Sequence, residues 1–443
     1  MIATNSGLQK RTEFGRGLRR KLKRSNHALW DATKRKHDPI EIVLEVNRKR
    51  IAELVPIKMA RMATSPFGFF RGSVPLMAAD LATLPSSGIP VQICGDAHVR
   101  NLGAFAGPDG RLVFDINDFD ETICAPWEWD LKRLGASLVL AGREAHSSDG
   151  VCRNAVLACA EIYRRKMTEF STMSSLDVEK YRIRRQFRGK PGSSVLQRAE
   201  KATPAHNLAK LTIARGKSRV FREIRPVLTH PAESRVRQVL QALKPYRETL
   251  PASCQHALDF YRAVDVALKV AGTGSVGSHD YVVLHFAGDG VADPLFLQIK
   301  QALPSAYARY GKASDRATHQ GQRVVRGQRM LQSESDILLG WTSVAGEDYI
   351  VRQLGDHASS IQPGDLKGVG LAEYATTCGE VLARGHARSG DPAVLAGYLG
   401  MSDRWDKALA KFAMSYADQT SKDYELFRKA IRSGKIKAGK TYS

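Results

Sequence analysis

Residues 93–122, ICGDAHVRNLGAFAGPDGRLVFDINDFDET, hold two acidic clusters that a short turn sequence joins. The turn sequence is GPDG, from Gly107 to Gly110, and apolar residues flank it on both sides. This pattern predicts that Leu102–Phe105 and Leu112–Ile116 pair as the strands of a β-hairpin. A hairpin of this size brings its two ends side by side, so the chain must place both acidic clusters in one small volume.

Three polar residues of these clusters, Asp96, Asn101 and Asp118, are therefore expected to converge. Carboxylates that lie together repel one another unless a cation sits between them, and carboxylate and amide oxygens suit Mg²⁺. An Asp-rich segment is also typical of a solvated turn, which is the alternative interpretation. The spacing favours function, because Asp96 and Asn101 are five apart, as in the catalytic loop of kinases. In that scheme the Asp accepts the substrate proton, whereas the Asn and a later Asp hold Mg²⁺.

The sequence after the hairpin, PWEWDLKRL, resembles the DPAYDLARL helix start of aminoglycoside and choline phosphotransferase-like enzymes. The interval from Asp118 to Asp130 fits that resemblance, and His98 matches a His of those enzymes. Cys94 departs from it, because those enzymes usually carry His there. The resemblance implies that Asp96 is the catalytic base, with His98 and Arg100 near the acceptor or the γ-phosphate.

A second cluster is the glycine-rich sequence GTGSVG, which spans Gly272 to Gly277 and includes Gly274 and Ser275. The surrounding alternation predicts three strands, Ala267–Ala271, Tyr281–Phe286 and Leu295–Lys300. A dinucleotide-binding glycine motif opens a helix after its first strand. Here the glycines lead into another strand, as in kinases, where the loop covers the nucleotide phosphates. The sequence therefore predicts that these residues bind a nucleotide.

Lys300 ends the third predicted strand in LQIK, similar to the kinase VAIK lysine that pairs with the α- and β-phosphates. A lysine at the surface end of a strand is the alternative interpretation. In kinases a carboxylate on the next helix holds this lysine. Here the helical pattern over Arg316–Leu338 offers Glu334, or less conventionally Gln328 or Gln332, and the pattern does not decide between them.

The order of these motifs is reversed relative to kinases, because Asp96 and Asp118 precede the glycines and Lys300. We interpret this as an α+β, circularly permuted protein-kinase-like fold, with a small antiparallel-sheet nucleotide lobe and a large, mainly helical lobe. The expected parts are a partly disordered basic segment (1–36), helices around the catalytic hairpin (37–263, hairpin 93–121), the nucleotide lobe (264–356) and further helices (357–443). A second strand pair, Leu339–Leu354, is expected to join the nucleotide lobe.

The motifs together resemble the bacterial domain-of-unknown-function 2252 family, from about Arg48 to the C-terminus. They are SPFGFFRG, GDAHVRNLG, FDINDFDET, PWEWDLKRL, GTGSVG, LQIKQA, GQRMLQSESD, VRQL and LARGHARSGD. The resemblance implies a kinase-like fold. We therefore expect an ATP- and Mg²⁺-dependent phosphotransferase that acts on the hydroxyl group of a small molecule.

Two other classes of function remain open. The sequence DFDET matches the DxDxT motif of haloacid-dehalogenase-like phosphatases, which would make the protein a metal-dependent phosphohydrolase. That motif needs an unbroken apolar strand before its first Asp, and Asp115 and Asn117 interrupt it here. A catalytically silent nucleotide-binding regulator is the other class, although the full set of expected site residues argues against it.

The formal net charge of +22 indicates affinity for anions but does not choose between nucleic acid, acidic lipid and phosphorylated small molecules. Nucleic acid is not favoured, because no aromatic residues interleave with the basic N-terminal residues. Arg71 stands out within an apolar sequence as a candidate partner for phosphate or carboxylate. No apolar run reaches the length of a membrane span, and the six cysteines form no CxxC motif, so we expect a cytoplasmic protein.

Overall fold

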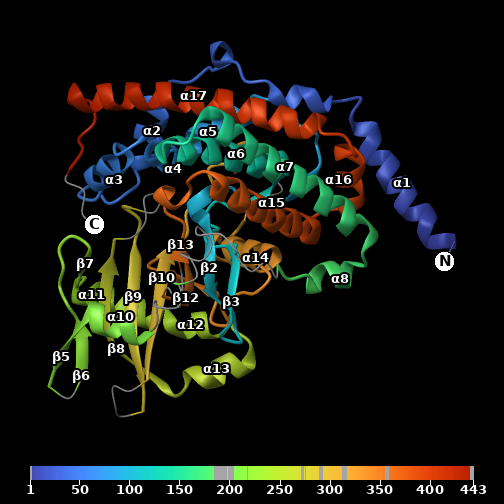
Figure 1. Cartoon of the computed structure of the whole chain (residues 1–443). Coiled ribbons are helices and arrows are strands. Elements are labelled where there is room, and N and C mark those ends of the chain that lie inside the picture. The colour runs from blue at the N-terminus through green and yellow to red at the C-terminus, as the bar shows by residue number, and fades with distance from the viewer. Residues whose placement is uncertain are drawn as a thin grey trace.

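The computed structural model separates into a helical part and a part built around an antiparallel sheet (Figure 1). It describes residues 2–439 except 184–196, 198–203, 217, 271–273, 275, 289–292, 312–316 and 355–358. Both ends of the described chain lie in the helical part, and the sheet comes from the middle of the sequence. The expected α+β class is confirmed.

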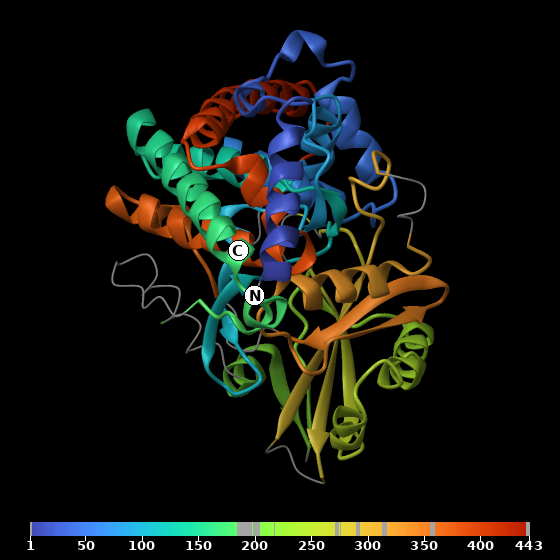
Figure 2. The same ribbon diagram turned by 90° about the vertical axis from the view of Figure 1, so that its right-hand side faces the viewer.

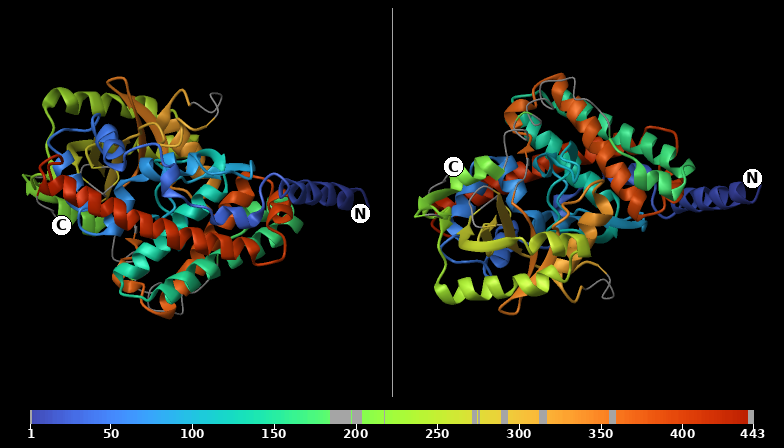
Figure 3. Two further views of the ribbon diagram at one scale, coloured as in Figure 1. Left: turned by 90° about the horizontal axis from the view of Figure 1, so that it is seen from above. Right: turned by 90° about the horizontal axis from the view of Figure 1, so that it is seen from below.

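The helical part surrounds one large apolar core. The α-helices of the described chain are α1 (Ile2–Leu18), α2 (Pro39–Asn47), α3 (Val55–Met62), α4 (Pro66–Gly72), α5 (Val74–Ala82), α6 (Glu128–Glu144), α7 (Asp149–Thr172), α8 (Ser175–Lys180), α10 (Pro204–Leu211), α11 (Glu233–Gln241), α12 (Leu243–Arg247), α13 (Ala252–Leu258), α14 (Gln320–Leu331), α15 (Val369–Ser389), α16 (Pro392–Leu399) and α17 (Arg404–Arg432). Figure 3 shows α17 running across the top of this part. Short 3₁₀ helices are η1 (Arg24–Ala28), η2 (Ala32–Lys34), η3 (Val99–Asn101) and η5 (Pro363–Asp365). Among the described residues, no helix combines the length and the apolar character that crossing a membrane requires.

The strands of the described residues form four antiparallel sheets. They are β1 (Pro90–Ile93), β2 (Leu102–Ala106), β3 (Leu112–Ile116), β4 (Ile123–Pro126), β5 (Thr212–Arg215), β6 (Ser218–Phe221), β7 (Leu228–Thr229), β8 (Tyr261–Lys269), β9 (Asp280–Ala287), β10 (Pro294–Gln301), β11 (Gly340–Val344), β12 (Glu347–Gln353) and β13 (Ser359–Ser360).

The largest sheet has the strand order β11-β12-β10-β9-β8-β7, and every pair of neighbours is antiparallel. This confirms that the two predicted strand groups join in one sheet, with β7 as an additional edge strand. Side chains alternate between its faces. Tyr281 and Val283 of β9 pack toward α11 and α12, whereas Val282 and Leu284 face the opposite side with Phe221. On β10 the same alternation directs Lys300 away from the face that α11 and α12 cover.

The predicted hairpin also exists, and it lies where the sheet meets the helical part. β2 and β3 pair in the expected register, and Gly107 and Gly110 close the turn with backbone hydrogen bonds of 2.8 and 2.9 Å. The strands β1 and β4, before and after the hairpin, pair with each other as well. Helix α14 contacts β11 and β12 on one side and α15 on the other, so it bridges the two parts (Figure 2).

The described residues of the basic N-terminal segment contact the helical part. Helix α1 packs against α16, and Arg19 and Arg24 donate hydrogen bonds to carbonyl groups at the end of α16. Arg35 is nearly buried between two carboxylates, with Nη2 2.6 Å from Asp80 and Nη1 2.8 Å from Asp423. Part of the basic charge of this segment therefore has partners inside the fold. The amino-acid composition gives the number of cations, but it does not show that Arg35 pairs with two acids that lie 45 and 388 residues away in the sequence.

We expect Arg35→Met to lower the free energy of unfolding by about 3 kcal/mol, because it leaves two buried carboxylates without their cation. Urea denaturation followed by circular dichroism measures the change. The matched control is Lys36→Met, which removes an exposed positive charge next to Arg35. A variant Arg35→Met that unfolds at the same urea concentration as Lys36→Met would show that this cluster contributes little to stability.

Candidate active site

The backbone of the loop that carries Asp96 is held by helix α6. The Asp130 carboxylate accepts hydrogen bonds from the backbone N–H groups of Cys94 and Gly95, at 2.8 and 2.9 Å. Gly95 has a positive φ of 81°, and a Cβ atom there would lie 2.3 Å from the Glu121 carbonyl oxygen. The loop therefore needs glycine at this position in order to pass so close to the second acidic segment.

The Asp96 side chain is held in place by a buried arginine of helix α6. Arg133 is fully buried, and its Nε lies 2.7 Å from Oδ1 of Asp96. A second Arg133 nitrogen donates to the Phe70 carbonyl oxygen at 3.0 Å. Burial raises the pKa of Asp96 above its usual value, although the positive charge of Arg133 acts in the opposite direction. The carboxylate is thus rigidly positioned in the pocket and binds a proton more readily than an exposed aspartate does.

His98 lies on the other side of this carboxylate, with Nε2 3.7 Å from Oδ2 of Asp96. Its Nδ1 accepts a hydrogen bond from the Arg100 backbone N–H at 3.1 Å, so the ring proton is on Nε2 and points toward Asp96. Burial lowers the pKa of His98 well below its usual value, so the ring is neutral. Arg100 itself is half-buried, and its charge contributes to lowering the pKa of Arg71.

Asn101 connects the Asp96 loop to the far end of the hairpin. Its side-chain nitrogen donates to the Asp96 carbonyl oxygen at 3.0 Å, and its backbone carbonyl accepts from the Asn117 N–H at 2.8 Å. Because the nitrogen is used in this way, the side-chain oxygen is the atom that Asn101 offers to a cation.

Lys300 reaches from β10 to the second acidic segment. Its Nζ lies 2.7 Å from Oδ2 of Asp120 and 3.4 Å from Oδ1 of Asp118, and its side chain is only 5% exposed. Burial alone would lower the pKa of Lys300, but the charges of Asp118 and Asp120 outweigh it and raise this pKa. Lys300 therefore faces Asp118, although the two residues are 182 positions apart.

The Asp118 carboxylate is partly open to solvent, with 39% of its side chain exposed. Its hydrogen bonds in the described structure fall on Oδ1, which accepts from Lys300 and from the Asp120 N–H. Burial would raise the pKa of Asp118, but Lys300 and Arg352 outweigh it and lower this pKa. Arg352 also donates to the Asn117 carbonyl oxygen at 3.4 Å, which ties the sheet to this segment. The geometry suits a carboxylate that stays ionised and binds a cation through Oδ2.

The glycine segment joins the antiparallel strands β8 and β9, as predicted. Its described residues rest on the chain between α2 and α3. The Gly277 carbonyl oxygen accepts from the Ile51 N–H at 2.8 Å, and Arg50 donates to the Val276 carbonyl oxygen at 2.7 Å. Gly277 has a φ of 88°, and a Cβ atom there would lie 2.9 Å from Arg50. The other two predicted phosphate-binding residues, Gly272 and Ser275, lie outside the described residues.

Helix α14 holds the second acidic segment with an arginine. Arg323 donates to the backbone carbonyl oxygens of Asp120 and Leu303, both at 2.8 Å, and to that of Thr122. The sequence of α14, QGQRVVRGQRML, contains no acidic residue. The helix that follows the lysine strand thus supplies a cation to the site where a kinase supplies a carboxylate.

The expected pairing of Glu334 with Lys300 is wrong. Glu334 follows the end of α14 and forms an ion pair of 2.6 Å with Arg182. Gln332, the less conventional candidate, donates to the Ile116 carbonyl oxygen at 2.6 Å, and Gln328 donates to Gln332. Gln332 thus supports the hairpin, and the carboxylates that hold Lys300 belong to the hairpin segment itself.

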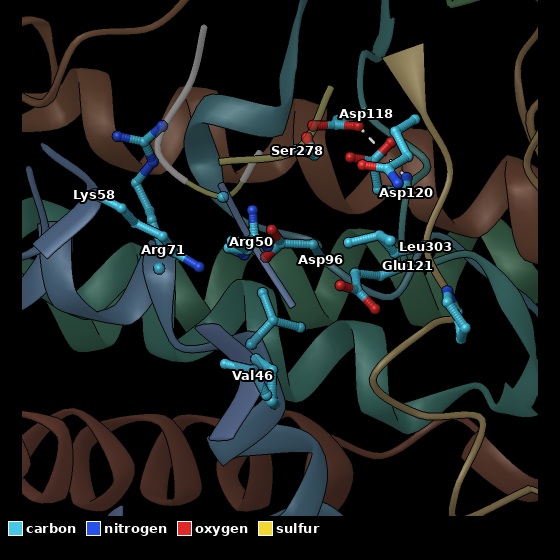
Figure 4. Close-up of a pocket in the computed structure, with 16 residues that line it drawn as sticks. Val46, Arg50, Lys58, Arg71, Asp96, Asp118, Asp120, Glu121, Ser278 and Leu303 are labelled. Carbon is cyan, nitrogen blue, oxygen red and sulfur yellow. Dashed lines mark hydrogen bonds between the residues drawn. The ribbon is translucent and has the colours of Figure 1, made fainter. Parts of the chain in front are cut away.

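Figure 4 shows the pocket that these elements enclose. Among the residues that the sequence singled out, Arg71, Asp96, Asp118 and Gly274 line it. The sequence interpretation did not select several other lining residues, namely Arg50, Lys58, Asp120 and Glu121. Asp120 could have been predicted from the sequence, because the DFD motif places a second carboxylate two residues after Asp118. Within the described parts of the chain, no group of three or more His, Cys, Asp or Glu side chains is arranged to hold a metal ion.

Residues 50–430 match the model of a family described as an uncharacterized protein conserved in bacteria (DUF2252). The chain therefore belongs to this bacterial family, which confirms the expected membership. No curated protein and no solved structure matches the chain.

Proposed function

We propose that this protein is an ATP- and Mg²⁺-dependent phosphotransferase with a circularly permuted kinase-like fold. The observation that carries the proposal is the contact of Lys300 with Asp118, which lines the same pocket as Asp96. These residues come from two parts of the chain that sequence order separates widely. They have the chemistry of the lysine, the metal-binding aspartate and the catalytic aspartate of kinases.

The connectivity of the large sheet supports the same proposal. A glycine segment joins its first two long strands, β8 and β9, and Lys300 lies on the next strand, β10. Helix α14 follows, and then β11 and β12 complete the sheet. Protein kinases place their glycine loop, lysine strand and following helix in this order along the chain. The permutation then consists of inserting this unit between helices of the other lobe.

In the proposed reaction the acceptor hydroxyl oxygen forms a bond to the γ-phosphorus of ATP. The bond from that phosphorus to the β,γ-bridging oxygen breaks, and ADP leaves with the electron pair. The hydroxyl proton passes to the Asp96 carboxylate, which Arg133 and His98 hold in place. Asp118 and the side-chain oxygen of Asn101 would hold Mg²⁺, and Lys300 would contact the phosphates. Such Mg²⁺ sites need only one or two carboxylates, because phosphates and water complete them. Bound Mg²⁺ would neutralise charge on the phosphates.

Calorimetric titration with ATP, in the presence and absence of Mg²⁺, tests the proposal. We expect tighter binding with Mg²⁺. Lys300→Met is expected to weaken the affinity by about tenfold to a hundredfold, because a hydrogen bond to a charged group contributes about 1.5–3 kcal/mol. The matched control is Arg262→Met, which removes an exposed cation from the same sheet and should leave the affinity unchanged.

Two results would contradict the proposal. ATP binding that does not respond to Mg²⁺ would argue against the assigned metal site, and binding that survives Lys300→Met would argue against the assigned phosphate site. Mg²⁺-dependent binding without transfer to any acceptor, water included, would instead indicate the silent nucleotide-binding regulator.

A further inference from the structure

One side of the pocket is built from three cations that the proposed reaction does not use. They are Arg50, which follows α2, Lys58 of α3 and Arg71 of α4, and we refer to them as the basic wall. Figure 4 shows Lys58 and Arg71 on one side of the pocket and Asp118, Asp120 and Glu121 on the other. All three come from the chain before the hairpin, and they belong to the helical part rather than to the sheet.

These cations lack carboxylate partners within the part of the chain that the structure describes. The Nη1 atom of Arg50 donates a hydrogen bond to the Val276 carbonyl oxygen, whereas its Nε atom is buried without a hydrogen bond among the described residues. The Nε atom of Arg71 is buried in the same way. Lys58 is only 2% exposed, although it lines the pocket. Lysine and arginine are seldom buried without a partner, since desolvating an unpaired charge is costly. The basic wall therefore has the character of a site for an anion.

The acidic residues across the pocket do not satisfy the basic wall. Asp96 is paired with Arg133, and Asp118 and Asp120 are paired with Lys300. The remaining carboxylate, Glu121, accepts a hydrogen bond of 2.6 Å from the Ala306 backbone N–H. The charge of Glu121 favours the protonated forms of Arg50 and Lys58, but among the described residues it forms no ion pair with either. The basic wall therefore has room for the charge of a ligand.

Burial affects the three cations unequally. Burial, reinforced by the charge of Arg50, lowers the pKa of Lys58 well below its usual value. Burial and the charge of Arg100 lower the pKa of Arg71 to about 10, so its guanidinium remains charged at pH 7. An anion placed among the three side chains would reverse both effects, because a nearby negative charge favours the protonated form of a base.

The basic wall lies on the Asp96 side of the pocket. Arg71 and Asp96 are close enough for each to shift the pKa of the other. Helix α4, which carries Arg71, also packs on the residues that fix Asp96. The Phe67 ring is 6.1 Å from the His98 ring, and Arg133 lies 3.9 Å above the Phe70 ring. An anion held by Arg71 would therefore sit beside the proposed catalytic base, whereas the nucleotide phosphates face Lys300.

We propose that the acceptor is a phosphorylated small-molecule alcohol, and that the basic wall of Arg50, Lys58 and Arg71 binds its phosphate group. This inference rests on the proposed function. Two guanidinium groups and one ammonium group suit a dianionic phosphate, since arginine binds phosphate oxygens through paired hydrogen bonds. With its phosphate anchored there, the free hydroxyl group of the acceptor is placed between Asp96 and the γ-phosphate of ATP.

Titration with inorganic phosphate at constant ionic strength tests the basic wall without an acceptor in hand. The titration is carried out with the protein alone and with the protein saturated by Mg²⁺ and the non-hydrolysable ATP analogue AMP-PNP. We expect phosphate to bind in both cases with similar affinity, because the analogue already fills the γ-phosphate position. Acetate, titrated in the same way, is expected to bind at least about tenfold more weakly.

Two variants remove single charges from the basic wall. Arg71→Gln and Lys58→Met are each expected to weaken phosphate binding by about tenfold to a hundredfold. Neither should change the affinity for Mg²⁺ and AMP-PNP by more than about twofold. Lys58→Met should not lower the melting temperature, because Lys58 has no carboxylate partner among the described residues, and replacing such a buried charge with an apolar side chain of similar volume is neutral or stabilising. The matched control is Lys49→Met, which removes an exposed charge next to Arg50.

Three outcomes would overturn the assignment. If AMP-PNP abolishes phosphate binding, the basic wall binds the γ-phosphate of the nucleotide and not the acceptor. If the two variants bind phosphate as tightly as the control, the anion binds elsewhere. If acetate binds as tightly as phosphate, the acceptor group is not a phosphate. Failure of AMP-PNP to bind would refute the proposed function alone, because titration of the unliganded protein tests the basic wall independently.

Discussion

Replacing Asp118 with asparagine is expected to remove the Mg²⁺-dependent part of ATP binding and to slow phosphoryl transfer about a thousandfold or more. The carboxylate supplies the negative charge that holds the metal ion, and a metal ion contributes several kcal/mol to stabilising the transferring phosphate. The fold should persist, because Asp120 still pairs with Lys300 at 2.7 Å. Thermal unfolding with ATP, recorded with and without Mg²⁺, measures the loss of binding, and ADP formation measures the loss of transfer.

The matched control for this prediction is Asp109→Asn. Asp109 lies in the turn of the same hairpin, at the end away from the pocket, and 61% of its side chain is exposed. This control should keep both the Mg²⁺ response and the rate. If Asp118→Asn also keeps the Mg²⁺-dependent stabilisation, the metal is held elsewhere and the assignment of Asp118 fails.

The parts of the site that sequence reasoning predicted depend on local signals. The GPDG turn and the alternating residues on either side specify the hairpin, because turn type and strand register are set over a few residues. The same signals specify β8, β9 and β10 and the glycine turn between the first two. The expectation that the two units meet rested instead on the resemblance of their motifs to those of kinases.

The partner of Lys300 could not be predicted in this way. Selecting Glu334 assumed that the helix after β10 continues beyond Leu331 and turns a carboxylate toward the sheet. The helix ends at Leu331, and its docking is set by contacts of Arg323 with carbonyl groups of the hairpin. Which of several carboxylates reaches a lysine depends on how two distant units dock, and no local pattern encodes that docking.

Sequence patterns also did not predict that residues of the basic wall are buried beside the pocket. Lys58 lies in the α3 sequence VPIKMARM, where nothing distinguishes it from the many exposed lysines that a basic protein carries. Its burial follows from the way α3 packs beside the glycine segment, where Leu54 and Ile57 form a small apolar cluster with Val276. Arg71 stands out in the sequence because apolar residues surround it, but its proximity to Asp96 depends on the packing of α4. A charged residue within an apolar sequence is thus a useful signal, whereas a charged residue within a basic sequence is not.

Asp96→Asn is expected to slow transfer by about 10²- to 10⁴-fold and to leave the affinity for Mg²⁺ and ATP within about threefold of the original value. Asparagine keeps the shape of the side chain but does not accept the hydroxyl proton. Wild-type activity should fall as the pH drops through the pKa of Asp96, which burial raises above its usual value, because the protonated carboxyl group is no longer a base. ADP formation measured across a pH series, with water as the acceptor where no better one is found, records both effects.

The interpretation of this variant depends on separating a chemical role of Asp96 from a structural one. Losing the carboxylate leaves the buried Arg133 with a weaker partner, so some loss of stability is expected in addition to the loss of rate. Asp31→Asn is the matched control, since Asp31 is exposed and asparagine caps a helix equally well. A structural defect would lower the affinity for ATP and the rate together and keep the acid limb of the pH profile. A catalytic base predicts that the rate and the acid limb are lost while ATP binding is kept, so retention of the limb in Asp96→Asn would exclude Asp96 as the base.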